Sequence, residues 1–508
     1  MVCFRQIAAA LVAIVAAVSN VAAQEAGEGR ICPLPRTSEE ILRLRLAITE
    51  YVEPHKFAPL AAWAMRAGHV EILDRWAKGR NASANEAKTE FSLAPLTQWL
   101  ALGRTASLPE IQESLASTVH AKVRSVSGDH KYFRNGVQVD PPPVDHAGGA
   151  QRAAMSLVIA SMLVQGRHAE AIEHFRLSQY PGERLWHINF LIDTGELDQA
   201  IALYRQPPTA SIFNSRPISA IAYGLIRNRQ LDRLAAFLDA ELARIREYFK
   251  ARPASKELVW HAQEPVLKLL SRLDRTDWEP PDPLPETSSL SAVASLIAAL
   301  RLAGREEDAE RLRKRAQGRL AAEAAERKQR QAERKLPRVD QMLFATPSAA
   351  TFDLWIEIER AYALALKGDL ENAEKALRPA QQEPFARFSR AAALAEVSVY
   401  ARHRRLWGKA EELLTLATRE PLYPPGSAPA TWLAAAADAQ RAGATDMAAR
   451  WMQMAGADFC GLDPDRREWF LSLPRSHPGY RKPFVLPYLD TLYVLMAVRE
   501  GLLPTNAR

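Results

Sequence analysis

The amino-acid sequence predicts an all-α protein, an α-α superhelix of helical hairpins with one small β-hairpin. The chain has 508 residues and is 48% hydrophobic, and Ala and Leu, which favour helices, supply much of that fraction. Long runs of β-branched residues, which build parallel sheets, are largely missing. A short turn phrase, Gly followed five residues later by Ala, recurs with helical patterns on both sides.

The first segment, residues 1–23, is typical of a secretory signal peptide. Arg5 precedes an apolar stretch from Ile7 to Val18, and small residues before Gln24 suit cleavage. The stretch is shorter than the roughly 20 residues that a transmembrane helix needs. We therefore expect a soluble periplasmic protein that meets the membrane only through its cleaved signal. An uncleaved anchor is the alternative.

The turn phrase indicates where helices meet. Gly accepts the positive φ that often ends a helix, and polar or acidic residues then suit the N-terminal dipole of the next helix. The small Ala allows the second helix to lie close to the first. The clear copies pair Gly166 with Ala171, Gly195 with Ala200, Gly304 with Ala309, Gly368 with Ala373 and Gly443 with Ala448, and degenerate copies begin at Gly68, Arg229 and Arg405.

These features resemble the tetratricopeptide repeat (TPR) family over about two thirds of the chain. That family places a large apolar residue four positions after the Ala, and here Phe175 follows Ala171 and Tyr204 follows Ala200. The spacing between copies departs from the family's steady repeat of about 34 residues. Each of the two longest gaps could hold a further degenerate repeat. The resemblance implies a helical solenoid whose concave face binds a protein or peptide.

Two other segments interrupt the helical pattern. In residues 131–140, Asn135-Gly136 between β-favouring residues predicts a two-residue hairpin turn. Residues 274–289 are rich in Pro and predict an extended linker. This linker would divide the mature chain into an N-terminal helical repeat lobe, 24–273, and a C-terminal TPR-like lobe, 290–508.

Within the second lobe, residues 305–338 interleave Arg, Lys and Glu with Ala. This pattern predicts a long helix exposed to solvent and supported by pairs four residues apart. A docking arm for an acidic partner is the alternative interpretation. A final apolar helix, residues 488–503, is expected to cap the array.

Two cysteines, Cys32 and Cys460, remain after removal of the leader. An even number of cysteines in an oxidising compartment favours a disulfide between them. Because bridged cysteines must lie within a few ångströms, that pairing requires a curled body. Two separate buried thiols are the alternative.

Catalytic signatures such as a Walker phosphate loop or a Gly-x-Ser-x-Gly elbow do not occur in the sequence. We therefore expect a protein that is not an enzyme and uses no cofactor or metal. His168, Glu170 and His174 are interpreted as solvated turn residues, because a spacing of six does not suit metal ligands. Six aromatic residues near the turns are interpreted as hairpin core rather than as a binding groove: Trp186, Trp355, Tyr362, Trp407, Trp432 and Trp451.

The formal charge of +7 is spread along the chain, whereas proteins that bind nucleic acid usually gather it on one face. We expect no nucleic-acid partner. The leading hypothesis is a non-catalytic periplasmic scaffold that binds a protein or peptide on its concave face in envelope assembly, secretion or motility. The alternative is a peptidoglycan-associated solenoid that resembles the helical domain of lytic transglycosylases, without the catalytic domain.

Overall fold

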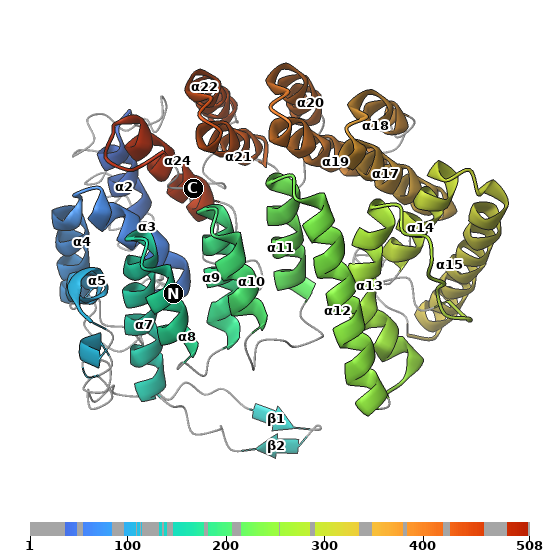
Figure 1. Cartoon of the computed structure of the whole chain (residues 1–508), viewed down its shortest axis with the longest axis horizontal. Coiled ribbons are helices and arrows are strands. Elements are labelled where there is room, and N and C mark those ends of the chain that lie inside the picture. The colour runs from blue at the N-terminus through green and yellow to red at the C-terminus, as the bar shows by residue number, and fades with distance from the viewer. Residues whose placement is uncertain are drawn as a thin grey trace, which may run out of the picture. The chain divides into compact units, whose positions relative to one another are not determined.

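A computed structural model shows the fold of the chain (Figure 1). It describes residues 36–47, 54–83, 96–107, 109–111, 113, 132–134, 137–139, 146–176, 181–205, 215–252, 254–284, 290–334, 348–378, 384–419, 427–461 and 485–505. These parts are nearly all helical, which confirms the all-α prediction. The chain divides into two compact units: unit 1 is Met1–Thr194 with Gly443–Arg508, and unit 2 is Gly195–Ala442.

Unit 1 contains helices from both ends of the chain. Its described helices are α2 (Ser38–Ala47), α3 (Pro54–Arg66), α4 (Val70–Ser83), α5 (Leu96–Thr105), α7 (His146–Val164), α8 (His168–Arg176), α9 (Pro181–Asp193), α22 (Thr445–Gly461) and α24 (Val485–Arg499). Helix α7 packs against both α3 and α5. The crossing with α5 is tight, because a Cβ atom on Gly103 would lie only 2.3 Å from the carbonyl oxygen of Val158.

The last helix, α24, packs against the first described helix, α2. Nε of Arg45 lies 2.6 Å from Oδ1 of Asp490, and 4% and 12% of the two side chains are exposed. The backbone N–H of Ser38 donates to Glu500 at 2.9 Å. The sequence predicts that this helix caps the array. Apolar side chains of α24 are buried around most of its surface, so it needs cover on several sides, and α2 supplies one of them.

A small β-hairpin also lies in unit 1. Strands β1 (Tyr132–Arg134) and β2 (Val137–Val139) pair antiparallel, with Arg134 opposite Val137. The pairing therefore brackets the Asn-Gly dipeptide of the sequence, as the turn signal predicts.

Unit 2 is a stack of helical hairpins. Its described helices are α10 (Leu197–Arg205), α11 (Ser215–Arg227), α12 (Leu231–Ala251), α13 (Lys256–Arg272), α14 (Leu290–Leu302), α15 (Glu306–Arg334), α17 (Ala349–Lys367), α18 (Leu370–Ala376), α19 (Pro384–His403), α20 (Trp407–Arg419) and α21 (Ser427–Arg441). In Figure 1, α11 to α13 (green) form one row and α17 to α21 (orange to brown) form another, with α14 at the bend.

The two rows of unit 2 meet through the first helices of their hairpins. Helix α14 packs against α13 and α17, and across the bend α13 contacts α17 and α11 contacts α19. We call the surface formed by α11, α13, α14, α17, α19 and α21 the inner face. Much of this face is therefore covered by the protein itself.

The Pro-rich segment is packed rather than extended in its described part, residues 274–284. Trp278 is buried, lies 5.7 Å from Trp260 between ring centroids, and donates to the hydroxyl of Ser271 at 3.1 Å. Leu284 is also buried, and α13 packs directly against α14. The compact units consequently do not divide at this segment, because its apolar residues belong to the core of unit 2.

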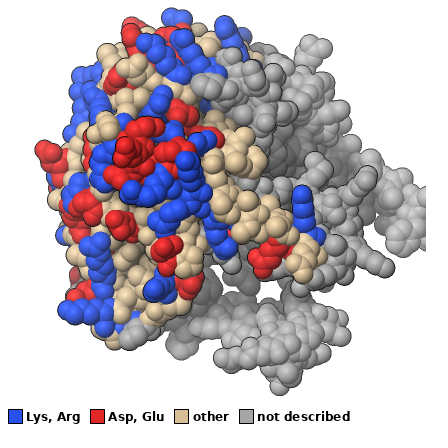
Figure 2. Space-filling view, turned by 90° about the vertical axis from the view of Figure 1, so that its right-hand side faces the viewer, with Lys and Arg blue, Asp and Glu red and all other residues tan. Residues whose placement is uncertain are grey.

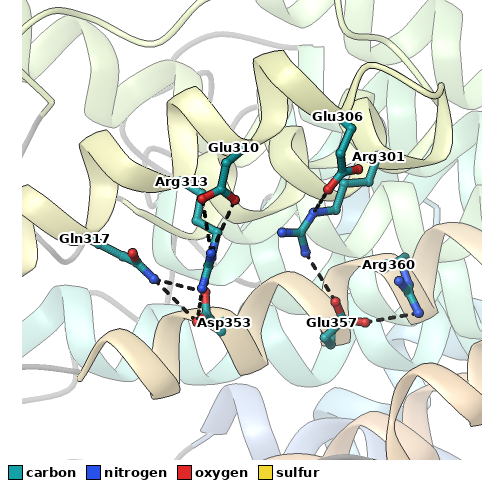
Figure 3. A network of polar contacts seen from close by, with 8 residues as sticks. All are labelled: Arg301, Glu306, Glu310, Arg313, Gln317, Asp353, Glu357 and Arg360. Atoms are coloured by element: carbon teal, nitrogen blue, oxygen red, sulfur yellow. Dashed lines mark hydrogen bonds and ion pairs between the residues drawn. The ribbon is translucent and has the colours of Figure 1, made fainter.

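Helix α15 accounts for the charged segment. Its inward side is lined by Ala309, Leu312, Ala316 and Leu320, all buried. Arg313 holds it to α17 by two contacts of 2.6 Å to the carboxylate of Asp353 (Figure 3). On the side of the molecule where α15 lies, acidic and basic side chains are interspersed (Figure 2). One face of the helix is thus anchored, and charges of both signs point outward.

The two longest gaps between turn copies have different contents. The first holds α13. Asp274, two residues after the end of α13, has a positive φ of 65°, but the packed Pro-rich segment follows it rather than a second helix. The second is taken up mainly by the 29 residues of α15. In the described residues neither gap holds a complete extra hairpin.

Candidate functional site on the inner face of unit 2

The repeat turns set the spacing of the helices and so position the inner face. All five glycines are left-handed, and the five alanines that follow them are buried. The φ values are 78° at Gly166, 88° at Gly195, 74° at Gly304, 93° at Gly368 and 76° at Gly443. Arg229 and Arg405, in the degenerate copies, also have positive φ, 58° each. These residues fix the backbone conformation of the turns. The polar side chains of the candidate site lie on the helices between the turns.

A buried ion pair joins the two rows of unit 2. Arg272, the last residue of α13, donates from Nε and Nη2 to the two carboxylate oxygens of Glu359 on α17, at 2.6 and 2.9 Å. Ser295 on α14 donates to the same carboxylate at 2.6 Å, and Nζ of Lys268 lies 3.2 Å from it. The guanidinium of Arg272 also lies 4.3 Å from the ring centre of Tyr362.

The electrostatics of this cluster keep Glu359 ionised. Burial alone would raise the pKa of Glu359, but the charge and hydrogen bonds of Arg272, with Lys268 and Ser295, outweigh it and lower the pKa to about 2. Glu396 lies 3.4 Å from Arg272, and 41% of its side chain is exposed. The cluster is therefore a charge-balanced contact between rows, with Glu396 at its open edge.

A second polar cluster lies between α11, α19 and α21. Asp438 on α21 is shared by Nε of Arg402 at 2.9 Å and by Nη1 of Arg441 at 3.1 Å. Burial would raise the pKa of Asp438, but these two guanidiniums, with a smaller contribution from Arg227, lower it. The imidazole of His403 is neutral, because burial lowers its pKa to about 3.

Tyr223 on α11 is the exposed member of this second cluster. Its ring meets that of His403 edge to face, 5.9 Å between centroids, and 40% of the residue is exposed. Burial on its protein side and the carboxylate of Asp438 raise the pKa of its hydroxyl to about 12. The ring thus packs against His403 on one side, and the residue is partly open to solvent. Its hydroxyl stays protonated and can donate a hydrogen bond.

Several residues singled out from the sequence are placed by the structure. Tyr362, Trp432 and Trp451 are buried, as the core interpretation predicts, while Trp355 and Trp407 are half-buried. The interpretation of His174 as solvated is wrong, since it is only 3% exposed. It follows the buried Ala171 by three residues, so it shares the inward side of α8. Cys32, and the side chains of Cys460 and Trp186, lie outside the described residues.

The charged residues of the inner face were missed by the sequence reasoning. A signal existed for Glu359, which lies three residues after Ile356 and three before Tyr362, on the buried side of α17. A carboxylate on the apolar side of a helix requires a buried partner. The packing of α13 against α17 decides which basic side chain pairs with Glu359. No short sequence pattern indicates that packing.

Neither known proteins nor metal-ligand patterns identify a chemical role for this face. No protein family model and no curated protein matches the chain. Within the described residues, no three or more His, Cys, Asp and Glu side chains gather as metal ligands would. Among the helices described, none has the length and apolar character needed to cross a membrane.

Proposed function

We propose that the chain is a non-catalytic TPR-like scaffold, exported to the periplasm, that holds a protein or peptide partner in envelope assembly, secretion or motility. The observation that carries the proposal is Tyr223, the one aromatic residue among the four large apolar side chains that are well exposed in the described residues. It lies on α11, its ring meets that of His403 on α19 edge to face, and the charge of Asp438 raises the pKa of its hydroxyl. Aromatic residues and arginines dominate the binding energy of many protein interfaces.

The packing of unit 2 restricts where a partner would bind. Contacts between the rows cover the part of the inner face around Arg272 and Glu359, so a groove along its whole length is not open. Two side chains of this face, Tyr223 and Glu396, are well exposed, at 40% and 41%, and we infer that a partner binds the part of the face between them. Burial of the hydroxyls of Tyr223 and Tyr400 raises the pKa of both, and Tyr400 feels the charges of both Tyr223 and Glu396. We call this part the Tyr223 strip.

Site-specific cross-linking in cells tests the proposal. A photoreactive amino acid replaces Tyr223 in the full-length protein, and a matched variant carries it at Leu258, which is 41% exposed on α13. We expect one dominant envelope protein to be cross-linked from position 223 and not from position 258. Identical background adducts from both positions would contradict the proposal. N-terminal sequencing of the recovered protein, with Gln24 as the expected first residue, tests export in the same sample.

A further inference from the structure

We infer that the Tyr223 strip binds a carboxylate group carried by a peptide segment of the partner. The inference rests on the proposed function and specifies the chemistry of its ligand. It follows from the balance of charge, from the hydrogen-bond donors left over in the second cluster, and from the exposed surface next to them.

The second cluster carries more positive than negative charge. Arg402 and Arg441 converge on the single carboxylate of Asp438. His403 adds no charge because it is neutral. Positive charges that outnumber their counter-ions in a partly buried place are costly, and an added anion offsets that cost.

Donors in this cluster also outnumber the acceptors. Nε of Arg441 is buried and donates to no protein acceptor. Nε of Arg402 lies close to Asp438, but its N–H is not aligned for a hydrogen bond. Arg441 keeps 22% of its side chain exposed and Arg402 only 3%, so of these two guanidiniums Arg441 is the one that a ligand can reach. Guanidinium groups bind carboxylates through paired, charge-assisted hydrogen bonds.

The surroundings favour a peptide over a small acid. The exposed ring of Tyr223, which meets His403 edge to face, provides apolar contact area next to the cluster. Further along the strip, Glu396 is 41% exposed and offers a negative charge. A segment that spans both places would position an acidic residue near Arg441 and could place a basic residue near Glu396.

Fluorescence anisotropy with labelled peptide pools tests the inference. One pool is made from Ala, Ser, Tyr, Lys, Asp and Glu, and the matched pool replaces Asp and Glu by Asn and Gln, both with blocked termini. The proteins are the mature wild type, Arg441→Gln, Tyr223→Ala and the control Arg311→Gln, which removes a charge that is 72% exposed on α15. Free glutarate serves as the small-acid competitor.

We expect the acidic pool to bind the wild type and Arg311→Gln at least about ten-fold more tightly than Arg441→Gln, the effect of losing one charge-assisted contact. Equal binding of the acidic and neutral pools, or full binding by Arg441→Gln, overturns the inference. Displacement of the peptides by glutarate at their own concentration overturns the peptide part of it. Thermal unfolding of each variant shows whether the fold is kept.

The cross-linking experiment separates this inference from the proposed function. If Arg441→Gln captures the same envelope partner as the wild type, the scaffold proposal stands and the carboxylate inference is overturned. If the wild type captures no partner but binds the acidic pool, the inference stands for the site and the proposed function fails.

Discussion

Glu359 and Arg272 form the best-connected ion pair between the rows of unit 2, and each is less than a tenth exposed. Removing one partner of such a pair leaves an uncompensated buried charge, which commonly costs about 3–5 kcal/mol. We expect Glu359→Gln to lower the free energy of unfolding by about that amount, because Arg272 would then be buried without its counter-ion. Chemical denaturation followed by circular dichroism measures the change.

A control variant and a double variant test whether the unpaired buried charge causes this loss of stability. Glu247→Gln removes a carboxylate of α12 whose side chain is 74% exposed, and it should change the stability by less than about 0.5 kcal/mol. Replacing Arg272 and Glu359 together by Met and Leu should recover part of the loss, because no charge of the pair is then left alone. Equal stability of Glu359→Gln and the wild type would show that the pair is solvated rather than buried.

His174 introduces a pH dependence into unit 1. Burial lowers its pKa to about 4, below the ordinary value of about 6.5, and neither ring nitrogen has a hydrogen-bond partner in the described residues. The unfolded chain therefore takes up a proton as the pH falls below about 6.5, while the folded chain does not. Stability is complete above that pH and is lost as the pH approaches about 4.

We expect the variant His174→Leu to abolish this contribution. Between about pH 7.5 and pH 5, one such histidine costs the wild type about 2 kcal/mol, so the variant should lose less stability over that interval. Urea denaturation at the two pH values measures the difference. His261→Leu, at an exposed position of α13, is the control and should follow the wild type. A variant at position 174 with an unchanged pH dependence would refute this account.

At the scale of elements, the crossing of α5 and α7 depends on a residue without a side chain. A Cβ atom on Gly103 would lie 2.3 Å from the carbonyl oxygen of Val158 and 2.9 Å from the Cβ of Ser161. Ser161 also donates to the carbonyl of Leu100 at 2.6 Å, which joins the same two helices. The helices approach so closely because one of them presents only backbone at the crossing.

We expect Gly103→Ala to destabilise unit 1 by about 1–3 kcal/mol, since the added methyl group forces the helices apart. Gly79→Ala is the matched variant, because Gly79 lies in α4 with nothing within 4 Å of its Cβ position. There the change should stabilise the helix by roughly 0.5–1 kcal/mol. Differential scanning calorimetry compares the two. The same sign for both variants would contradict the close crossing.

At the scale of the whole chain, the two ends meet within unit 1 through α2 and α24. We expect truncation before residue 485 to expose α2 and to remove amide protection there, while α13 and α17 of unit 2 stay protected. Hydrogen exchange read by mass spectrometry distinguishes the units. Loss of protection throughout unit 2 would show that the units do not unfold separately.

The point variant Asp490→Asn tests the same contact more gently. It removes the carboxylate charge that lies 2.6 Å from Nε of the buried Arg45, so protection of α2 should fall, while the exposed control Asp446→Asn should leave it unchanged. The meeting of the ends is compatible with the disulfide predicted between Cys32 and Cys460, which stays a prediction. Mass measurement of the protein with and without reduction and alkylation tests it.

The local structure of this protein follows from residues that are close together along the chain. Gly368 shows why: its left-handed conformation and the helices on either side follow from φ preferences and from apolar residues three and four positions apart. The small Ala373 is buried for the same local reason. Helical hairpins, their turns and their buried faces could all be read from neighbours along the chain.

Which helix faces meet depends on contacts between residues that are far apart in the sequence. Arg272 and Glu359 are far apart in sequence, and their pairing depends on the bend between the rows at α14. The cluster around Tyr223 likewise combines residues of α11, α19 and α21. Helix α24 packs against α2, which comes from the other end of the chain. Such contacts arise from the burial of whole helix surfaces and the satisfaction of buried charges, which no short stretch of sequence encodes.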